Sequence, residues 1–275
     1  VDSSIVSDTP SGAPYSSGLT KPISGSGGHG FWVDETGPIM TGSASELNIT
    51  SDTQTFTIEA WIYPLTINAQ SPAHDYRFTS IVSQGQVYAS FGYVDDGTLR
   101  WYTYDGTAHY INSPPRTVRT RTWQHLAVVS NGGTVKLYKN GVEVASGTLE
   151  DPNGGQSDDI HIGNADLTFQ SDALLGHISN LRITSTAVYT SNFTPSTGPL
   201  TSITGTKLLC CQSADSATAA TTATSSLSSA GQISVSGFNP FLDDISTVKG
   251  QEGSSVSYTH LTLPTNREVK ISEVA

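Results

Sequence analysis

Residues 122–147 read TWQHLAVVSNGGTVKLYKNGVEVASG, and this stretch decides the fold class. Apolar residues alternate with polar ones on both sides of short Asn-Gly segments. Asn-Gly between alternating apolar residues is a strong local signal for a β-hairpin, because both turn positions need a positive φ that these residues tolerate. The stretch therefore predicts three consecutive antiparallel strands, at residues 123–130, 134–139 and 142–145.

The two-residue turn in this stretch also predicts the register of the last two strands. It places Leu137 opposite Val144 on one face of the hairpin and Tyr138 opposite Glu143 on the other. Side chains alternate between the two faces of a strand, so the turn and the apolar pattern agree on which face is buried. An antiparallel meander with one buried face is expected.

The composition of the 275-residue chain suits strands and turns. Charged residues make up 13 %, 26 residues are glycine, and the formal net charge is −11. This charge argues against a nucleic-acid partner, which would need clustered Lys and Arg. No apolar stretch approaches the ~20 residues of a membrane span, so membrane insertion is not expected. No signal peptide is visible at the start of the chain, and secretion is left open.

Two adjacent cysteines, Cys210 and Cys211, are the full complement of thiols. This number excludes a disulfide-stapled scaffold and zinc sites built on cysteine pairs. Neighbouring strand residues point to opposite faces, so a bridge between the two would be strained. We predict two small apolar side chains on a terminal strand.

Short strand candidates follow one another at spacings of roughly 8–12 residues without a convincing long helix, which predicts an all-β, antiparallel β-sandwich. In one candidate, residues 56–64, apolar side chains at even positions alternate with Thr57, Glu59, Trp61 and Tyr63. The predicted organisation is an irregular entry at 1–22, the sandwich at 23–212, a Ser/Thr/Ala-rich linker at 213–232, a last strand or the start of a following module at 233–253, and a non-native-looking tail at 254–275.

Three blocks in this order resemble a known family. They are FTIEAWIYP (56–64), TWQHLAVV (122–129) with LYKNGVEVA (137–145), and HIGNADL (161–167) followed by LGHISNLRITSTAVYTSNFTP (175–195). Together they resemble the laminin G-like, concanavalin A-like lectin/glucanase domain over about residues 23–212. The resemblance implies an antiparallel jelly-roll β-sandwich, often with Ca²⁺ at one rim, and a role in binding glycans or cell-surface receptors.

Two further resemblances concern the end of the chain. The segments AVYTSNFTP (187–195), GTKLLCCQ (205–212) and FNPF (238–241) are similar to laminin G-like domains in large structural proteins of marine bacteriophages and their metagenomic relatives. The segment VSYTHLTLPTNREV (256–269) resembles a translated sequencing-adapter peptide. It is therefore set aside from the fold.

Hydrolysis is the sharpest alternative function, because glucanases share this sandwich. Such enzymes need two carboxylates about 5 Å apart, and the family pattern Glu-x-Asp-x-(x)-Glu is absent from the sequence. Glu59 and Glu143 each stand alone on their strands, and no Gly-x-Ser-x-Gly motif is present. His125 lies in the middle of a strand, where we expect a hydrogen-bonded core histidine. A catalytic function is not predicted.

A calcium site is one candidate feature of the loops. Ca²⁺ prefers six to eight oxygen ligands, which Asp, Asn and backbone carbonyls of loops can provide. The Gly-rich loop after residue 150 offers Asp151, Asn153, Asp158 and Asp159. The alternative is that Asp, Asn and Gly are there because turns need them.

A sugar site is the other candidate feature. Pyranose rings stack on aromatic faces, and their hydroxyls bind fixed polar groups. If Leu99 and Trp101 face the core, the alternate residues of the same strand form an outer surface, with further tyrosines close by in sequence. The candidate residues are Arg100, Tyr102, Tyr104, Tyr93 and Tyr110. The alternative is ordinary sheet packing, since Tyr is a good strand former.

These observations predict a non-catalytic module that binds a glycan or a cell-surface receptor. It would belong to a larger, tail-associated virion or other surface protein, beside neighbouring modules of the same chain. The expected location is the virion surface or the extracellular space. The alternatives are a purely structural or protein–protein module without a sugar site and, third, a glycoside hydrolase.

Overall fold

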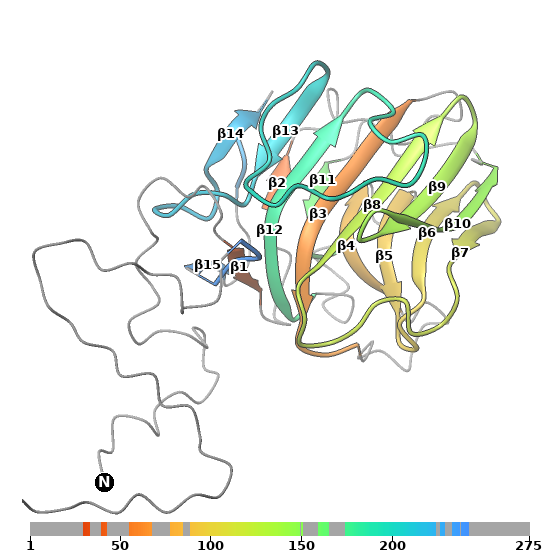
Figure 1. Cartoon of the computed structure of the whole chain (residues 1–275), viewed down its shortest axis with the longest axis horizontal. Helices are drawn as coiled ribbons and strands as arrows, with labels where there is room; N and C mark the ends of the chain where they lie inside the picture. Colours follow the sequence, from red (N-terminus) through yellow and green to blue (C-terminus); the bar gives the residue numbers. More distant parts are fainter. Residues whose placement is uncertain are drawn as a thin grey trace, which may run out of the picture. The chain divides into compact units, whose positions relative to one another are not determined.

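A computed structural model of the chain describes an all-β domain built from two antiparallel sheets that lie face to face (Figure 1). The described residues fall in the first of two units of the chain, Val1–Leu242. None of the described segments forms a helix long and apolar enough to span a membrane. The structure describes residues 30–33, 40–42, 55–67, 78–84, 89–148, 150, 159–164, 174–223, 226–228, 233–236 and 238–241.

The larger sheet has nine strands and branches at its centre. Its main order is β10-β9-β8-β3-β12-β1-β15, and β12 pairs with β1 along its first half and with β13 along its second half. β13 pairs in turn with β14. The strands are β10 (Val142–Thr148), β9 (Thr134–Lys139), β8 (Gln124–Asn131), β3 (Phe56–Pro64), β12 (Gly176–Thr184), β1 (Gly30–Val33), β15 (Ile233–Ser236), β13 (Thr206–Cys210) and β14 (Ala220–Ala223).

The smaller sheet has the order β2-β11-β4-β5-β6-β7. Its last three strands form a meander whose turns contain Gly97 and Gly106, both at positive φ, as the Asp-Gly turn sequences favour. The strands are β2 (Met40–Gly42), β11 (Ile160–Ile162), β4 (Phe78–Gln84), β5 (Ala89–Val94), β6 (Leu99–Tyr104) and β7 (Ala108–Asn112).

The β9–β10 hairpin confirms the predicted turn and corrects part of the predicted register. Tyr138 pairs with Glu143 as expected, but Leu137 pairs with Ala145 and not with Val144. A β-bulge between Glu143 and Ala145 takes up one extra residue, which shifts every later pair by one position. β10 therefore continues to Thr148 along the edge of the larger sheet.

The core lies between the two sheets. Phe56 and Ile58 of β3 point into it with the alternation that the sequence predicts, and they pack with Leu99 and Trp101 of β6. The rings of Phe56 and Trp101 lie 5.3 Å apart. The prediction that Leu99 and Trp101 face the core is therefore confirmed.

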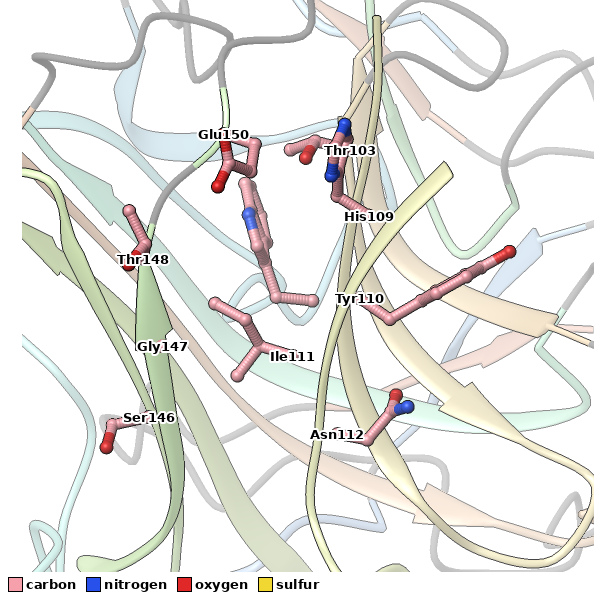
Figure 2. Close-up of a pocket in the computed structure, with 10 residues that line it drawn as sticks. Thr103, His109, Tyr110, Ile111, Asn112, Ser146, Gly147, Thr148 and Glu150 are labelled. Atoms are coloured by element: carbon pink, nitrogen blue, oxygen red, sulfur yellow. The ribbon is translucent and has the colours of Figure 1, made fainter. Parts of the chain in front are cut away.

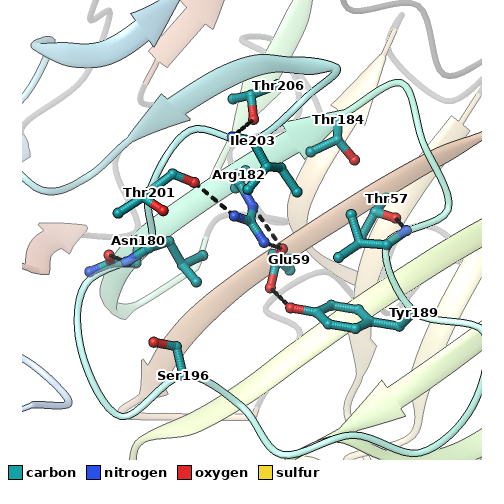
Figure 3. Close-up of polar contacts among 12 residues, drawn as sticks. Thr57, Glu59, Asn180, Arg182, Thr184, Tyr189, Ser196, Thr201, Ile203 and Thr206 are labelled. Atoms are coloured by element: carbon teal, nitrogen blue, oxygen red, sulfur yellow. Dashed lines mark hydrogen bonds and ion pairs between the residues drawn. The ribbon is translucent and has the colours of Figure 1, made fainter.

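The outer face of β3 carries a buried carboxylate. Glu59 Oε1 accepts hydrogen bonds from Nε and Nη2 of Arg182 at 2.9 and 2.5 Å, and Oε2 lies 2.7 Å from the hydroxyl of Tyr189 (Figure 3). Oε2 also lies 3.0 Å from Nε2 of His125. Burial by itself raises the pKa of Glu59, but the His125 hydrogen bond, the charges and the Tyr189 hydroxyl together lower it below its usual value. His125 is buried and hydrogen-bonded, as the sequence predicts, but it lies on the outer face of the larger sheet and not in the core between the sheets.

The connection from β12 to β13 covers this carboxylate and crosses the outer face of the larger sheet (Figure 1). The rings of Tyr189 and Phe193 stack 3.5 Å apart, and Phe193 also meets the ring of Tyr138 at 5.4 Å. The Thr57 hydroxyl on β3 donates to the carbonyl of Thr186 at 2.7 Å. These contacts bury polar groups of the sheet that a bare outer face would expose to water.

A second segment, residues 238–241, packs on another part of the same outer face. Phe238 meets the rings of Tyr63, Trp123 and His177 at 4.8, 5.3 and 5.1 Å, and Phe241 lies 5.8 Å from Trp61. Trp61 and Trp123 are therefore packing residues.

The sandwich extends beyond the boundary predicted at residue 212. β14 lies inside the expected linker and pairs with β13, and β15 pairs with β1, so both segments continue the larger sheet. Residues 233–236 are therefore a strand of this domain, not the start of another module. The entry at 1–22, the remainder of 233–253 from residue 242 on, and the tail at 254–275 lie outside the described residues.

The two cysteines correct a prediction about side-chain direction. Cys211 follows the end of β13 at a φ of 62°, which turns its side chain back beside that of its neighbour. The Sγ atoms of Cys210 and Cys211 lie 3.5 Å apart, and both side chains belong to the core. Both are free thiols, and burial raises the pKa of Cys211.

We expect the stability of the domain to fall in mild acid because of His177. This side chain is 0 % exposed, and burial lowers its pKa from 6.5 to about 4. As the pH falls from 6.5 towards 4, the unfolded chain takes up a proton that the folded chain does not. Each pKa unit corresponds to about 1.4 kcal/mol, so the free energy of unfolding should drop by about 3 kcal/mol across this window.

Urea denaturation of His177→Gln at pH 7, 5.5 and 4.5 measures this effect, since the variant should lose most of the slope. His109→Gln, at a half-buried position on β7, serves as the matched control and should keep it. An unchanged slope in His177→Gln would assign the acid sensitivity to other groups.

Candidate functional site

The aromatic residues predicted as a sugar site lie on β6 and β7. The alternation of β6 puts Arg100, Tyr102 and Tyr104 on its outer face, opposite to the core. Tyr110 of β7 pairs with Tyr102, and their rings lie 5.4 Å apart. Tyr110 is 43 % exposed, whereas Tyr102 is 6 % exposed, so Tyr110 offers the accessible ring.

Arg100 and Asn112 form the polar side of this surface. The Arg100 Cζ atom lies 4.5 Å from the ring centroid of Tyr110, a cation–π distance. Arg100 Nε donates to Asn112 Oδ1 at 2.8 Å, and burial lowers the pKa of Arg100. The three side chains fix one another, and we call the set Arg100, Tyr110 and Asn112 the outer platform.

Three of the predicted residues do not belong to the outer platform, and one of them is the buried Tyr102. Tyr93 of β5 is 0 % exposed and lies in the core, because its partner in the ladder is the inward-facing Leu99. Tyr93 is therefore removed from the candidate site, and burial raises the pKa of its hydroxyl. Tyr104 is half-buried at the end of β6, opposite Ala108.

A pocket of about 380 Å³ lies on the other side of β7, between this edge strand and β10 of the larger sheet. In Figure 2, Ile111 points from β7 towards β10, whereas the Tyr110 ring points away from β10. Gly147 lies opposite Ile111 on β10, and a Cβ there would come within 2.9 Å of Ile111 Cγ1. The absent side chain at residue 147 thus lets Ile111 pack closely against β10. We call this cavity the β7–β10 pocket.

The β7–β10 pocket has polar groups on several sides. Its lining includes Thr103, His109 and Glu150, and His109 Nε2 lies 3.2 Å from Asp105 Oδ1. Asp105 also accepts the backbone N–H of Thr107 at 2.9 Å, and these contacts lower the pKa of its carboxyl. The carboxylate therefore orients the imidazole at the pocket.

Two lining groups, Nε1 of Trp101 and Nε2 of His109, have no hydrogen-bond partner in the described part of the chain. The side chain of Trp101 is 2 % exposed, and its Nε1–H has no hydrogen-bond acceptor in the described part of the chain. A buried donor without an acceptor costs about 1–3 kcal/mol, so the pocket favours an oxygen atom of water or ligand beside Trp101. Sequence reasoning placed Trp101 in the core but missed the pocket that it lines.

The predicted calcium ligands fall mostly outside the described residues. Asp151, Asn153 and Asp158 lie outside the described residues, whereas Asp159 is described and is exposed just before β11. Within the ranges that the structure describes, no three His, Cys, Asp or Glu side chains gather in a way that could hold a metal ion. The calcium site stays a prediction.

A family model described as concanavalin A-like lectin/glucanases superfamily, of the laminin G type, matches residues 34–191. The chain belongs to this superfamily. The two stacked antiparallel sheets and the β3, β8–β10 and β12 blocks agree with the resemblance seen in the sequence. No curated protein matches the chain.

Solved structures with the same concanavalin A-like fold include two at a TM-score above 0.5. One is a protein from Bacteroides ovatus described as carbohydrate-binding, with 16 % identity and a TM-score of 0.53 over 76 % of this chain and 59 % of that chain. The other is the heptameric SAP-like pentraxin of Limulus polyphemus, with 15 % identity and a TM-score of 0.51 over 78 % of this chain and 96 % of that chain. The chain thus spans about three fifths of the length of the Bacteroides protein.

Proposed function

We propose that this concanavalin A-like domain binds carbohydrate at the outer platform without cleaving it. The observation that carries the proposal is the exposed ring of Tyr110, held beside the guanidinium of Arg100 and the amide of Asn112. An aromatic face next to fixed planar donors suits a pyranose ring, whose C–H face stacks while its hydroxyls bind the polar groups.

The platform has unused hydrogen-bonding capacity. The hydrogen bond from Arg100 to Asn112 uses Nε, and in the described part of the chain neither Nη of Arg100 nor Nδ2 of Asn112 forms a further hydrogen bond. These groups are donors, and sugar hydroxyl oxygens are acceptors. Because Arg100 is already ordered by its neighbours, little side-chain entropy would be lost on binding.

The positions of the described glutamates support a non-catalytic role. Glu59 is enclosed beneath the β12–β13 connection, and Glu143 pairs with Lys136 at 2.8 Å. Glu150 lines the β7–β10 pocket, where no second carboxylate joins it among the lining residues. A retaining glycosidase would need two carboxyl groups about 5 Å apart at one site.

The remaining parts of the proposal concern the setting of the domain. We place it in a larger extracellular or virion-surface protein, beside other modules of the same chain, with a glycan or cell-surface receptor as partner. The resemblance of 187–195, 205–212 and 238–241 to marine phage structural proteins supports a tail-associated location. A rim Ca²⁺ held by the Asp151–Asp159 loop would be a structural cofactor there.

Replacing Tyr110 with alanine is expected to weaken glycan binding about tenfold, since an aromatic pair contributes about 0.5–1.5 kcal/mol beyond its buried area. A glycan array identifies the ligand, and titration calorimetry on the whole chain, with Ca²⁺ and again with chelator, measures the affinity. Tyr110→Phe keeps the ring and should retain most of the affinity.

Val142→Ala is the matched control, because Val142 is a large apolar side chain on β10 that is 53 % exposed and is not part of the platform. It should bind as the parent does. Binding that is insensitive to Tyr110→Ala would remove the platform as the site. No binding by a folded domain would favour a structural or protein–protein module.

A further inference from the structure

The β7–β10 pocket is a separate feature from the outer platform. Tyr110 and Asn112 of the outer platform also border the pocket, but Ile111 points from β7 towards β10, whereas the Tyr110 ring points away from β10 (Figure 2). A ligand stacked on the Tyr110 ring would therefore not fill the pocket. The volume of about 380 Å³ lies in the range of small-molecule sites, roughly 300–1,000 Å³, and suits one monosaccharide unit.

The charge of the pocket restricts its ligand. Glu150 contributes a carboxylate that has no ion pair in the described part of the chain, and the lining contains neither Lys nor Arg. The other ionisable lining groups are Tyr110 and His109, and Nε2 of His109 faces Asp105. Such a site favours a positive charge and disfavours a carboxylate ligand.

The hydrogen-bonding groups add a second requirement. The Nε1–H of Trp101 is nine-tenths or more buried and needs an acceptor, whereas the carboxylate of Glu150 accepts and cannot donate when ionised. A ligand must therefore present an oxygen to Trp101 and an N–H or O–H donor to Glu150. A polyol with an amino group has both.

We infer that the β7–β10 pocket is a second ligand site, which binds a single amino-sugar unit through Trp101 and Glu150. A neutral sugar can form the same hydrogen bonds through its hydroxyl groups, but it lacks the positive charge of the amino group. A uronic acid places a second carboxylate near Glu150. The site therefore ranks ligands by charge: amino sugar first, neutral sugar second, uronic acid last.

The Trp101 indole N–H provides a direct probe. The chain has four tryptophans, so a ¹⁵N–¹H spectrum resolves few indole signals, and the Trp101→Phe variant assigns the one of interest. The probes are glucosamine, glucose and glucuronic acid, with the galacto-configured set in parallel. We expect the Trp101 signal to move with glucosamine or galactosamine at an affinity about tenfold above that of the matching neutral sugar, and about a hundredfold above that of the uronic acid.

Glu150→Gln is the decisive variant, because Glu150 is exposed and its replacement keeps the size of the side chain. It should reduce the preference for the amino sugar over the neutral sugar to less than about threefold, since the charge is gone. Glu143→Gln on β10, where the carboxylate pairs with Lys136, is the control and should leave the preference unchanged.

Two results would overturn the second site: a Trp101 signal that none of the six sugars moves, or a uronic acid that binds as tightly as the amino sugar. The same measurements test the proposed glycan site at the outer platform independently of the second site. Tyr110→Ala should leave the Trp101 response intact, so a platform that fails to bind glycans while Trp101 still responds refutes the proposed function alone. Glycan binding that depends on Tyr110 without a Trp101 response refutes the second site alone.

Discussion

Replacing Arg182 with methionine is expected to lower the free energy of unfolding by about 3–5 kcal/mol, because it leaves a buried carboxylate without its cation. Glu59 is 0 % exposed and receives two hydrogen bonds from Arg182. Arg182 also donates through Nη1 to the carbonyl of Thr201 at 2.8 Å, so the change frees a carbonyl of the β12–β13 connection as well. Urea denaturation at pH 7 measures the loss.

The surface pair between Lys136 and Glu143 is the matched control. Its N–O distance is 2.8 Å, but both side chains are 32 % exposed to water, so Lys136→Met should cost far less than Arg182→Met. The double variant Glu59→Gln, Arg182→Met removes both charges and should recover part of the loss. A cost for Arg182→Met as small as that of the surface pair would show that the buried carboxylate takes up a proton and needs no cation.

The pH dependence of this network has a definite sign. The folded-state pKa of Glu59 is lowered, so its contribution to stability is present above the unfolded pKa of 4.5 and is lost as the pH falls through the folded value. This loss begins at a lower pH than that caused by His177, whose window opens at 6.5. The two groups therefore act one after the other during acidification.

Local patterns in the sequence predicted strands and turns well where the residues of a turn or the alternation of a strand specify its geometry. The Asn140–Gly141 turn and the alternation of β3 and β6 follow from side chains within a few residues of one another. The bulge in β10 cannot be predicted in this way, because nothing in the alternation of residues 142–145 indicates which residue is left unpaired. The strand β14 within the expected linker was likewise not predicted, because it is an edge strand whose residues are half-buried or exposed and show no apolar pattern.

The sites depend on residues far apart in the chain, which local patterns cannot pair. Glu59 stands alone on its strand in the sequence, but Arg182 and Tyr189 lie 123 and 130 residues away along the chain. The β7–β10 pocket is formed where edge strands of two different sheets meet, and its one local signal is a glycine, Gly147, inside a strand. Two residues of the outer platform, Arg100 and Tyr110, were singled out from the sequence because they lie close together along it, whereas Asn112 on the same hairpin was not.

Replacing Gly141 with alanine is expected to destabilise the domain by about 4 kcal/mol. Gly141 has a φ of 78°, where an L-residue costs about 1–2 kcal/mol, and an added Cβ would lie 1.8 Å from the backbone oxygen of Phe193. Backbone atoms at that distance must separate, which would break the 2.8 Å hydrogen bond from Phe193 N to Gly141 O. Phe193 would then leave its contact with Tyr138, so the loss adds burial of aromatic surface to the strain.

Gly132 supplies the control within the same meander. Its φ is 59°, but no atom lies within 4 Å of the position that a Cβ would take. Gly132→Ala should therefore carry the backbone cost of about 1–2 kcal/mol and nothing more. The difference between the two variants, measured by urea denaturation, isolates the close approach of the β12–β13 connection to the β9–β10 turn. Equal losses of unfolding free energy in the two variants would mean that the β12–β13 connection can move away from the turn at little cost. The position of this connection over Glu59 would then depend on the hydrogen bonds of Arg182 and Tyr189.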